Sequence, residues 1–193
     1  MCKHSFLLKF ISIIWISSVI SQGLQSPCPS ADPVIVNDVA FIKLGTYRGF
    51  ADDGSEYQKS YFISRYSKTP WAESKAICRA FDLEFTTLES NSELQSFLNI
   101  IDNNSYLRTI SDTFFWIDGI SLTPKSKTDW YWTKSGKKLT FSLPWALNQP
   151  DFLRVDEFCL ALGKSSNQKF GFHDGICSAS ISFVCQRIEL YVP

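Results

Sequence analysis

The chain contains 193 residues, of which 45% are hydrophobic, and its 19 basic side chains balance its 19 acidic ones. A chain of this length can bury a sizeable core in one domain and leaves little room for a second. The balanced charge gives no indication of a nucleic-acid-binding surface or of a polybasic membrane patch, so neither partner is expected.

The first 23 residues have the layout of a secretory signal peptide. Basic residues precede an apolar run from Phe10 to Ile20, and the small residues Ser21 and Gly23 follow it. The run is too short to span a bilayer comfortably, which disfavours a signal anchor, and no later segment is apolar enough to span one. We expect residues 1–23 to be removed and the protein to be secreted. Their removal deletes two lysines and no acid, leaving 17 basic and 19 acidic side chains and a net charge of −2.

Residues 24–40 predict an extended N-terminal arm, because their first part, LQSPCPSADPVI, is rich in proline and has no periodicity. The globular domain is expected at 41–187, with a C-terminal tail at 188–193. Inside it, YFIS at 61–64 predicts a strand. A helix should follow, with Thr69 as its N-cap and Pro70 at its first position. Residues 83–89 predict a short strand.

A second helix has the clearest pattern in the chain. Ser90 and Glu93 form a capping box, in which each side chain bonds a backbone N–H at the helix start. One stripe of apolar residues follows at i, i+3, i+4 and i+7, namely Leu94, Phe97, Leu98 and Ile101.

From Thr113 onward the pattern changes to short aromatic or β-branched runs separated by Gly, Ser, Asn and Lys. These runs are TFFWIDGI, DWYWT, KKLTF, EFCLAL, KFGFHD and ISFVC. The fold class is therefore α+β, with two helices and short antiparallel sheets. Residues 139–162 lack a regular pattern up to their last positions, which predicts a long loop, and long ordered loops are usually functional.

Four tryptophans in this part of the chain allow two interpretations. Trp116, Trp130, Trp132 and Trp145 could form a platform on which sugars stack, or most of them could fill the core of a small antiparallel sheet. The second interpretation is favoured.

Five cysteines remain after the signal peptide: Cys28, Cys78, Cys159, Cys177 and Cys185. In an exported protein they should be oxidised, and an odd number leaves one for an intermolecular bond or a free thiol. Spacing alone leaves their pairing open. The triplet Asn103-Asn104-Ser105 is an acceptor for N-glycosylation at Asn103, which fits the same compartment.

Six motifs in one order make residues 41–186 resemble the C-type lectin-like domain family. They are Cys78 in the first helix, Trp116-Ile117-Asp118-Gly119-Ile120, Gln149-Pro150-Asp151, Glu157 before Cys159, Phe172-His173-Asp174 before Cys177, and Phe183-Val184-Cys185. The resemblance implies the C-type lectin fold and the disulfides Cys78–Cys185 and Cys159–Cys177. The Trp-Ile-Asp-Gly form of the second motif is similar to that of single-domain arthropod lectins.

The resemblance also implies one calcium site. In sugar-binding members of the family, the ion is held by the proline-containing tripeptide, by the later glutamate and by the Asn-Asp pair before the third cysteine. Carried over by position, the metal ligands are Gln149, Asp151, Glu157, His173 and Asp174. Calcium takes six to eight oxygens, and a sugar can enter its shell with two adjacent hydroxyls. The resemblance further implies a cis peptide bond before Pro150, a geometry that occurs chiefly before proline.

The order amide then acid in Gln149-Pro150-Asp151 resembles galactose-type members. The implied sugar-binding residues are Gln149, Asp151, Glu157 and His173, with Phe152 as a stacking residue. Galactose binders often place this aromatic in a glycine-rich loop, whereas no glycine lies between Phe152 and Cys159 here. His173 also departs from the pattern, because imidazole offers nitrogen where calcium prefers oxygen, so a weakened site is expected.

Two functions remain open. The favoured one is a secreted, calcium-dependent carbohydrate-binding protein. The alternative is a C-type lectin-like domain that binds a protein or another surface without calcium, with His173 and Asp174 as a structural hydrogen-bonded pair. A second calcium site would need acids between Ile120 and Trp130, where only Asp129 occurs.

An enzyme is not expected. Only His4 and His173 occur in the chain, and no nucleophile motif accompanies the second. A zinc site built from His173, Asp174 and Glu157 is a minor alternative, because imidazole with carboxylates suits zinc.

Cys28 lies in the proline-rich arm, where a thiol can reach another chain without straining the domain. We expect a disulfide-linked homodimer through Cys28, which would supply the multivalency that weak sugar sites need. A free or capped thiol is the alternative.

Overall fold

The computed structural model describes residues 40–190 except 52, 111–113, 124 and 165–168. The expected signal peptide, Cys28 and almost all of the expected arm lie outside the described residues. The elements in chain order are β1 (Phe41–Phe50), β2 (Glu56–Ser64), α1 (Trp71–Ala80), β3 (Glu84–Phe85), α2 (Asn91–Asn103), α3 (Ser105–Thr109), β4 (Phe114–Ser121), β5 (Trp130–Tyr131), β6 (Glu157–Lys164), β7 (Phe170–Ile176) and β8 (Ser182–Leu190). None of the helices in this part of the chain combines the length and apolarity needed to cross a membrane.

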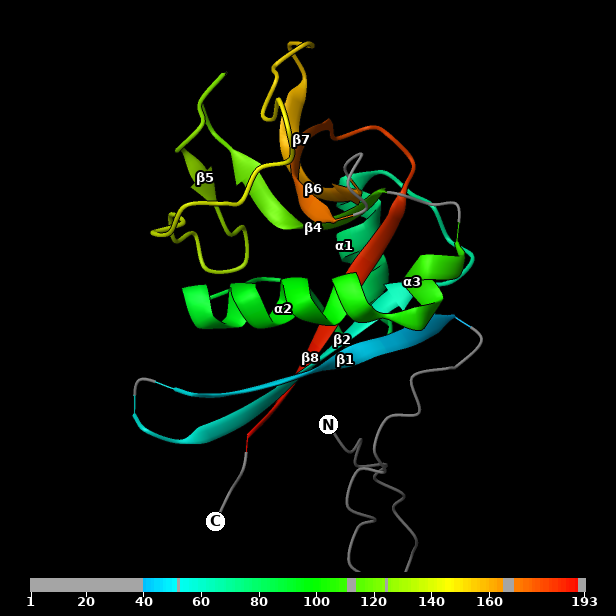
Figure 1. The fold of residues 1–193 in the computed structure, drawn as a ribbon, viewed down its shortest axis with the longest axis vertical. Coiled ribbons are helices and arrows are strands. Elements are labelled where there is room, and N and C mark those ends of the chain that lie inside the picture. The colour runs from blue at the N-terminus through cyan, green and yellow to red at the C-terminus, as the bar shows by residue number, and fades with distance from the viewer. Residues whose placement is uncertain (1–39, 52, 111–113, 124, 165–168, 191–193) are drawn as a thin grey trace, which may run out of the picture. The chain divides into compact units, whose positions relative to one another are not determined.

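One mixed sheet organises these elements (Figure 1). Its strand order is β1-β2-β8-β4-β6-β7, with β3 on β8 and β5 on β4. All strand pairs are antiparallel except β4 with β8, which run parallel. Short antiparallel sheets were expected, and the parallel β4–β8 pair instead joins the strands into one mixed sheet. Helix α2 packs against β1, and α1 packs against β3, β4 and β8.

The sheet begins with a long hairpin that the sequence pattern predicts only in part. Strands β1 and β2 pair along their whole lengths, from Phe41–Ser64 to Phe50–Glu56. Only residues 61–64 were expected as a strand, because polar and glycine residues interrupt the alternation in the rest of the hairpin. Strand β8 extends into the first residues of the expected tail as far as Leu190, which pairs with Tyr57.

Helices α1 and α2 confirm two predictions, with small differences. Helix α1 begins at Trp71 with Pro70 as N-cap, and Thr69 instead forms a bridge with Ile181. Ser90 caps α2 by accepting a hydrogen bond from the Glu93 N–H. Helix α3 was missed, because five residues are too short to show a periodic stripe. The expected strand KKLTF contributes only a single bridge, from Lys138 to Tyr131.

Two disulfides fix the core, with the predicted pairing. Cys78–Cys185 ties α1 to β8 across 107 residues, and Cys159–Cys177 ties β6 to the turn after β7 across 18 residues. Trp116, Trp130 and Trp132 are almost completely buried. They therefore fill the core, as the favoured interpretation predicted.

Gly119 in β4 provides a test of this packing. Its φ of +140° suits only glycine, and an added Cβ would lie 2.8 Å from the Leu160 side chain. We expect Gly119→Ala to lower the free energy of unfolding by about 2–3 kcal/mol, through backbone strain and overpacking. Gly136, with φ +66° and nothing within 4 Å of an added Cβ, is the matched control. Gly136→Ala should cost only about 1 kcal/mol in the same urea denaturation, and equal costs would contradict this packing.

Candidate functional site

The long segment between β5 and β6 is held against β7 at its centre. Trp145 forms a parallel bridge with Phe172, and backbone hydrogen bonds join Ala146 N to Phe172 O and Phe172 N to Pro144 O. The Trp145 ring also packs on the rings of Trp130 and Phe172. The segment is therefore ordered by the core below it, which places the residues that follow Ala146 beside the end of β7.

Three carboxylates converge at that place. One oxygen from each of Asp151, Glu157 and Asp174 lies within 4.8 Å of the others. Asp174 is buried, and its two oxygens accept hydrogen bonds from the backbone N–H groups of Asp151 (3.1 Å) and Phe152 (3.0 Å). Glu157 accepts one from the Arg154 N–H at 3.0 Å. The loop backbone therefore fixes the acidic group, although the repulsion among its charges is not relieved by any basic side chain in these contacts.

Gln149 adds an amide to this acidic group. The Gln149–Pro150 peptide bond is cis, as predicted. The Gln149 Nε2 atom donates a hydrogen bond to Asp151 Oδ2 at 2.8 Å. Its Oε1 atom is buried and has no hydrogen-bond partner among the described residues. Because a buried amide oxygen without a partner is costly, this atom indicates a missing ligand.

This arrangement fits a calcium ion. Two oxygens on opposite sides of calcium lie about 4.6–5.2 Å apart, since each calcium–oxygen distance is about 2.3–2.6 Å. The carboxylate spacing of at most 4.8 Å agrees with that value, and the unpaired Gln149 Oε1 offers a fourth oxygen. A hard cation with several oxygen ligands would also offset the repulsion among the three carboxylates.

His173 does not join this group. Successive side chains of a strand point to opposite faces, so Asp174 and His173 diverge on β7. The His173 ring packs edge-on against Phe114 (5.0 Å between centroids), and its Nε2 atom is buried without a partner. Burial lowers the pKa of His173 below its usual value, and Asp174 and Asp151 offset part of this effect. Among the described residues, His173 does not join Asp174 and Glu157 as the predicted zinc site requires. The expected hydrogen-bonded pair of His173 and Asp174 does not form either, because Asp174 accepts hydrogen bonds from backbone N–H groups instead.

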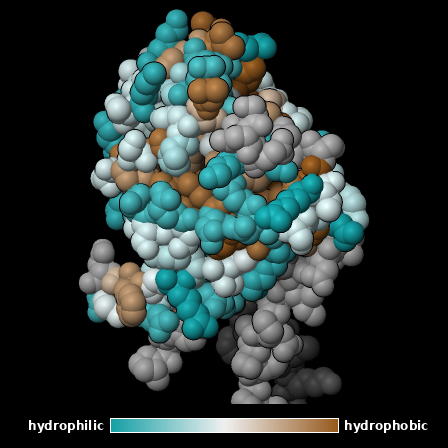
Figure 2. Space-filling view, viewed as in Figure 1, coloured by the Kyte–Doolittle hydropathy of each residue, from teal (hydrophilic) through white to brown (hydrophobic). Residues whose placement is uncertain are grey.

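Exposed aliphatic side chains lie in the same loop as Asp151, a feature that the sequence analysis did not predict. Leu147, Leu153 and Val155 are 76%, 80% and 85% exposed, and Phe152 is half-buried with a φ of +51°. Figure 2 shows hydrophobic residues at the top of the view, where the loop before β6 lies in Figure 1. Leucine and valine in a sequence suggest burial, so only their positions in the folded loop reveal this surface.

Two other predicted positions lie elsewhere. Asp129 pairs with Lys138 at 2.8 Å and accepts a hydrogen bond from the Tyr131 hydroxyl at 3.1 Å. Hydrogen bonds from Lys138 and Thr123 lower the pKa of Asp129 to about 2. Asn103 is exposed at the end of α2, so its glycosylation stays a prediction at an accessible position.

Comparison with known proteins identifies the family. The model of the lectin C-type domain matches residues 67–187. The chain belongs to the C-type lectin domain family. It is 31% identical over 118 residues to C-type lectin BML-1 of Bungarus multicinctus, covering 60% of this chain and 69% of that lectin. It is 30% identical over 118 residues, with the same coverage, to a C-type lectin galactose-binding isoform of Pseudechis australis.

Solved C-type lectin structures share the fold. The domain of murine dendritic cell inhibitory receptor 2 in complex with N-glycan superposes with a TM-score of 0.52 at 18% identity, over 68% of this chain and 91% of that one. The carbohydrate-recognition domain of mouse scavenger receptor C-type lectin gives 0.51 at 22% identity, over 75% and 95%. The Ca2+-independent C-type lectin SPL-2 from Saxidomus purpuratus gives 0.51 at 20% identity, over 67% and 86%. The hairpin of β1 and β2 precedes the residues that the family model matches.

Proposed function

We propose that this protein is a secreted lectin that binds saccharides through a calcium ion. The observation that carries the proposal is the group of Asp151, Glu157 and Asp174 beside the unpaired Gln149 Oε1. These four residues would hold the ion. When bound, calcium would supply coordination positions for two adjacent hydroxyls of a sugar. The protein's own part is to hold the oxygens in place, which the backbone hydrogen bonds to Asp174 and Glu157 do.

The order of Gln149 and then Asp151, an amide followed by an acid, supports the galactose-type preference. This order determines on which side of the site a sugar hydroxyl would meet the amide. A relative in the same family is named a galactose-binding isoform. Phe152 leaves part of its ring exposed beside Asp151, where it could contact the apolar face of a sugar.

The proposal is tested by probing a glycan array with the mature protein, once in the presence of calcium and once in the presence of a chelator. We expect galactose-terminated glycans to give signal only with calcium. Because one sugar buries little area, the array must present clustered glycans or the protein must be multimerised. Signal that survives the chelator unchanged would reject a calcium-dependent site.

One observation favours the alternative of a calcium-independent surface for a protein or another ligand. The exposed Leu147, Leu153 and Val155 give the loop an apolar rim, which suits contact with a protein. A member of the same fold, SPL-2, is named as independent of calcium. A folded protein that gives no glycan signal in either condition would support this alternative.

A disulfide-linked homodimer through Cys28 is part of the proposal, because two linked sites would raise the apparent affinity. On a non-reducing gel the mature protein should migrate as a dimer, and Cys28→Ser should migrate as a monomer. Monomer migration of both proteins would reject the dimer.

Glycosylation at Asn103 should appear as a loss of mass on treatment with an N-glycosidase.

A further inference from the structure

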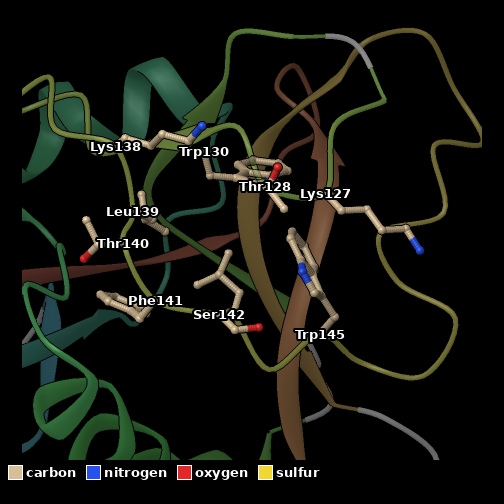
Figure 3. A pocket seen from close by; sticks show the side chains of 10 residues that line it. Lys127, Thr128, Trp130, Lys138, Leu139, Thr140, Phe141, Ser142 and Trp145 are labelled. Atoms are coloured by element: carbon tan, nitrogen blue, oxygen red, sulfur yellow. The ribbon is translucent and has the colours of Figure 1, made fainter.

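A hollow lined in part by Trp145 shares no residue with the proposed calcium site. It has a volume of about 350 Å³ and is lined by β5 and the segment that follows it. Figure 3 shows the Trp130 and Trp145 rings on one side, the segment from Leu139 to Ser142 along the other, and Lys127 extending outward. Small-ligand sites begin at about 300 Å³, so the hollow can take roughly one ring of a ligand.

The lining of this hollow is rich in hydrogen-bond donors. Trp130 is 1% exposed, and its Nε1–H has no partner among the described residues. Thr128, Thr140 and Ser142 add hydroxyl groups around it. A buried N–H donor without an acceptor is costly, so an acceptor that reached the Trp130 N–H from the hollow would be stabilised.

The segment that lines the hollow carries more basic than acidic side chains. Residues 125–138 contain five lysines and one acid, Asp129, in a chain whose 19 basic and 19 acidic side chains balance as a whole. Asp129 is already paired with Lys138. Lys127 lines the rim and forms no ion pair with the described residues. An adjoining hollow of about 590 Å³ shares the segment 138–141 and adds Lys134, Lys137 and Glu89 to its lining. Lys134 is paired with Glu84, which leaves Lys137 as the added lysine without an ion pair among the described residues.

We propose that this surface binds an acidic saccharide chain, one that carries carboxylate or sulfate groups. The Trp130 N–H and the hydroxyls would bind ring oxygens or an acidic group, and the exposed part of Trp145 would contact a ring face. Lys127 and Lys137, which form no ion pair with the described residues, would neutralise successive acidic groups along the chain. The proposal extends saccharide binding to a second surface and does not require calcium, because none of the three carboxylates of the calcium site lines it.

The test titrates a heparin-derived hexasaccharide, which carries carboxylates and sulfates, into mature protein in a calorimeter with chelator present. We expect binding that weakens as salt rises and no binding of neutral maltohexaose. Lys127→Glu should weaken binding at least about tenfold, because it removes a charge-assisted contact and adds repulsion. Ser142→Trp should fill the hollow and weaken binding similarly. Both positions are exposed, so the fold should persist by circular dichroism.

Lys43→Glu is the matched control, because it makes the same charge reversal on the exposed face of β1, away from both hollows. Lys43→Glu should change the affinity for the hexasaccharide by less than about twofold, because salt screens an exposed charge that lies far from the bound ligand. The proposal is overturned if the hexasaccharide does not bind, if Lys43→Glu weakens binding as much as Lys127→Glu, or if single-stranded oligothymidylate of equal charge binds as tightly. Glu157→Gln should leave binding of the hexasaccharide unchanged. A failure of the acidic-saccharide proposal can therefore be distinguished from a failure of the calcium-site proposal.

Discussion

Replacing Lys59 by methionine should lower the free energy of unfolding by about 3–5 kcal/mol, because it leaves a buried carboxylate without its counter-charge. Lys59 and Glu93 are 1% and 0% exposed, and their charged groups lie 2.5 Å apart. The Lys59 Nζ atom also donates to the Thr87 carbonyl at 3.2 Å. Tyr61 donates to Glu93 at 2.8 Å, so the pair lies within a network that joins β2 to α2.

The exposed pair of Lys134 and Glu84 is the matched control for this prediction. Its nitrogen–oxygen distance is 2.6 Å, but its side chains are 48% and 39% exposed. Lys134→Met should therefore cost less than about 1 kcal/mol in the same chemical denaturation. Equal losses of unfolding free energy in the two variants would mean that burial does not determine the cost of breaking the Lys59–Glu93 ion pair.

Glu93 shows why the sequence predicts elements better than side-chain partners. The spacing of Ser90 and Glu93 predicts the start of α2, and the Ser90 half of the capping box forms. The Glu93 carboxylate turns inward instead, to Lys59, Tyr61 and the Glu89 N–H. A capping pattern describes four consecutive residues, whereas the buried lysine comes from a strand 34 residues earlier, so only the tertiary packing reveals it.

The same limit applies to the candidate site. The family resemblance placed Asp151, Glu157 and Asp174 together, and the structure brings these three carboxylates within one ion's reach. It also implied His173, which the structure places against Phe114. The contact of His173 with Phe114 depends on the pairing of β4 with β6 and of β6 with β7, which the spacing of the motif does not contain. The long hairpin and the apolar loop rim were missed because they depend on pairing and exposure, which no local pattern encodes.

Glu157→Gln should have opposite effects on stability without and with calcium. In chelator, the substitution removes one of three neighbouring negative charges, while the amide oxygen can still accept the Arg154 N–H. The melting temperature should therefore stay equal to that of wild type or rise. With calcium at about one hundred times its Kd, wild type should gain about 2.7 kcal/mol, whereas the variant should gain much less.

Asp156→Asn is the matched control for this variant. Asp156 is the neighbouring carboxylate, but it is exposed, lies 3.7 Å from the Arg154 guanidinium and does not belong to the group of three. Its replacement should leave the calcium-induced rise in melting temperature almost unchanged. A loss of that rise in Asp156→Asn equal to the loss in Glu157→Gln would show a general charge effect instead of a defined site.

A calorimetric calcium titration of the mature protein tests the central claim most directly. The three carboxylates and Gln149 Oε1 predict saturable binding of one calcium ion per chain. Glu157→Gln should weaken this binding by at least about tenfold, because affinity depends on the number of charged ligands, and Asp156→Asn should retain it. Absence of saturable calcium binding to the folded wild-type protein, or equal affinity in wild type and Glu157→Gln, would contradict a calcium site at these residues.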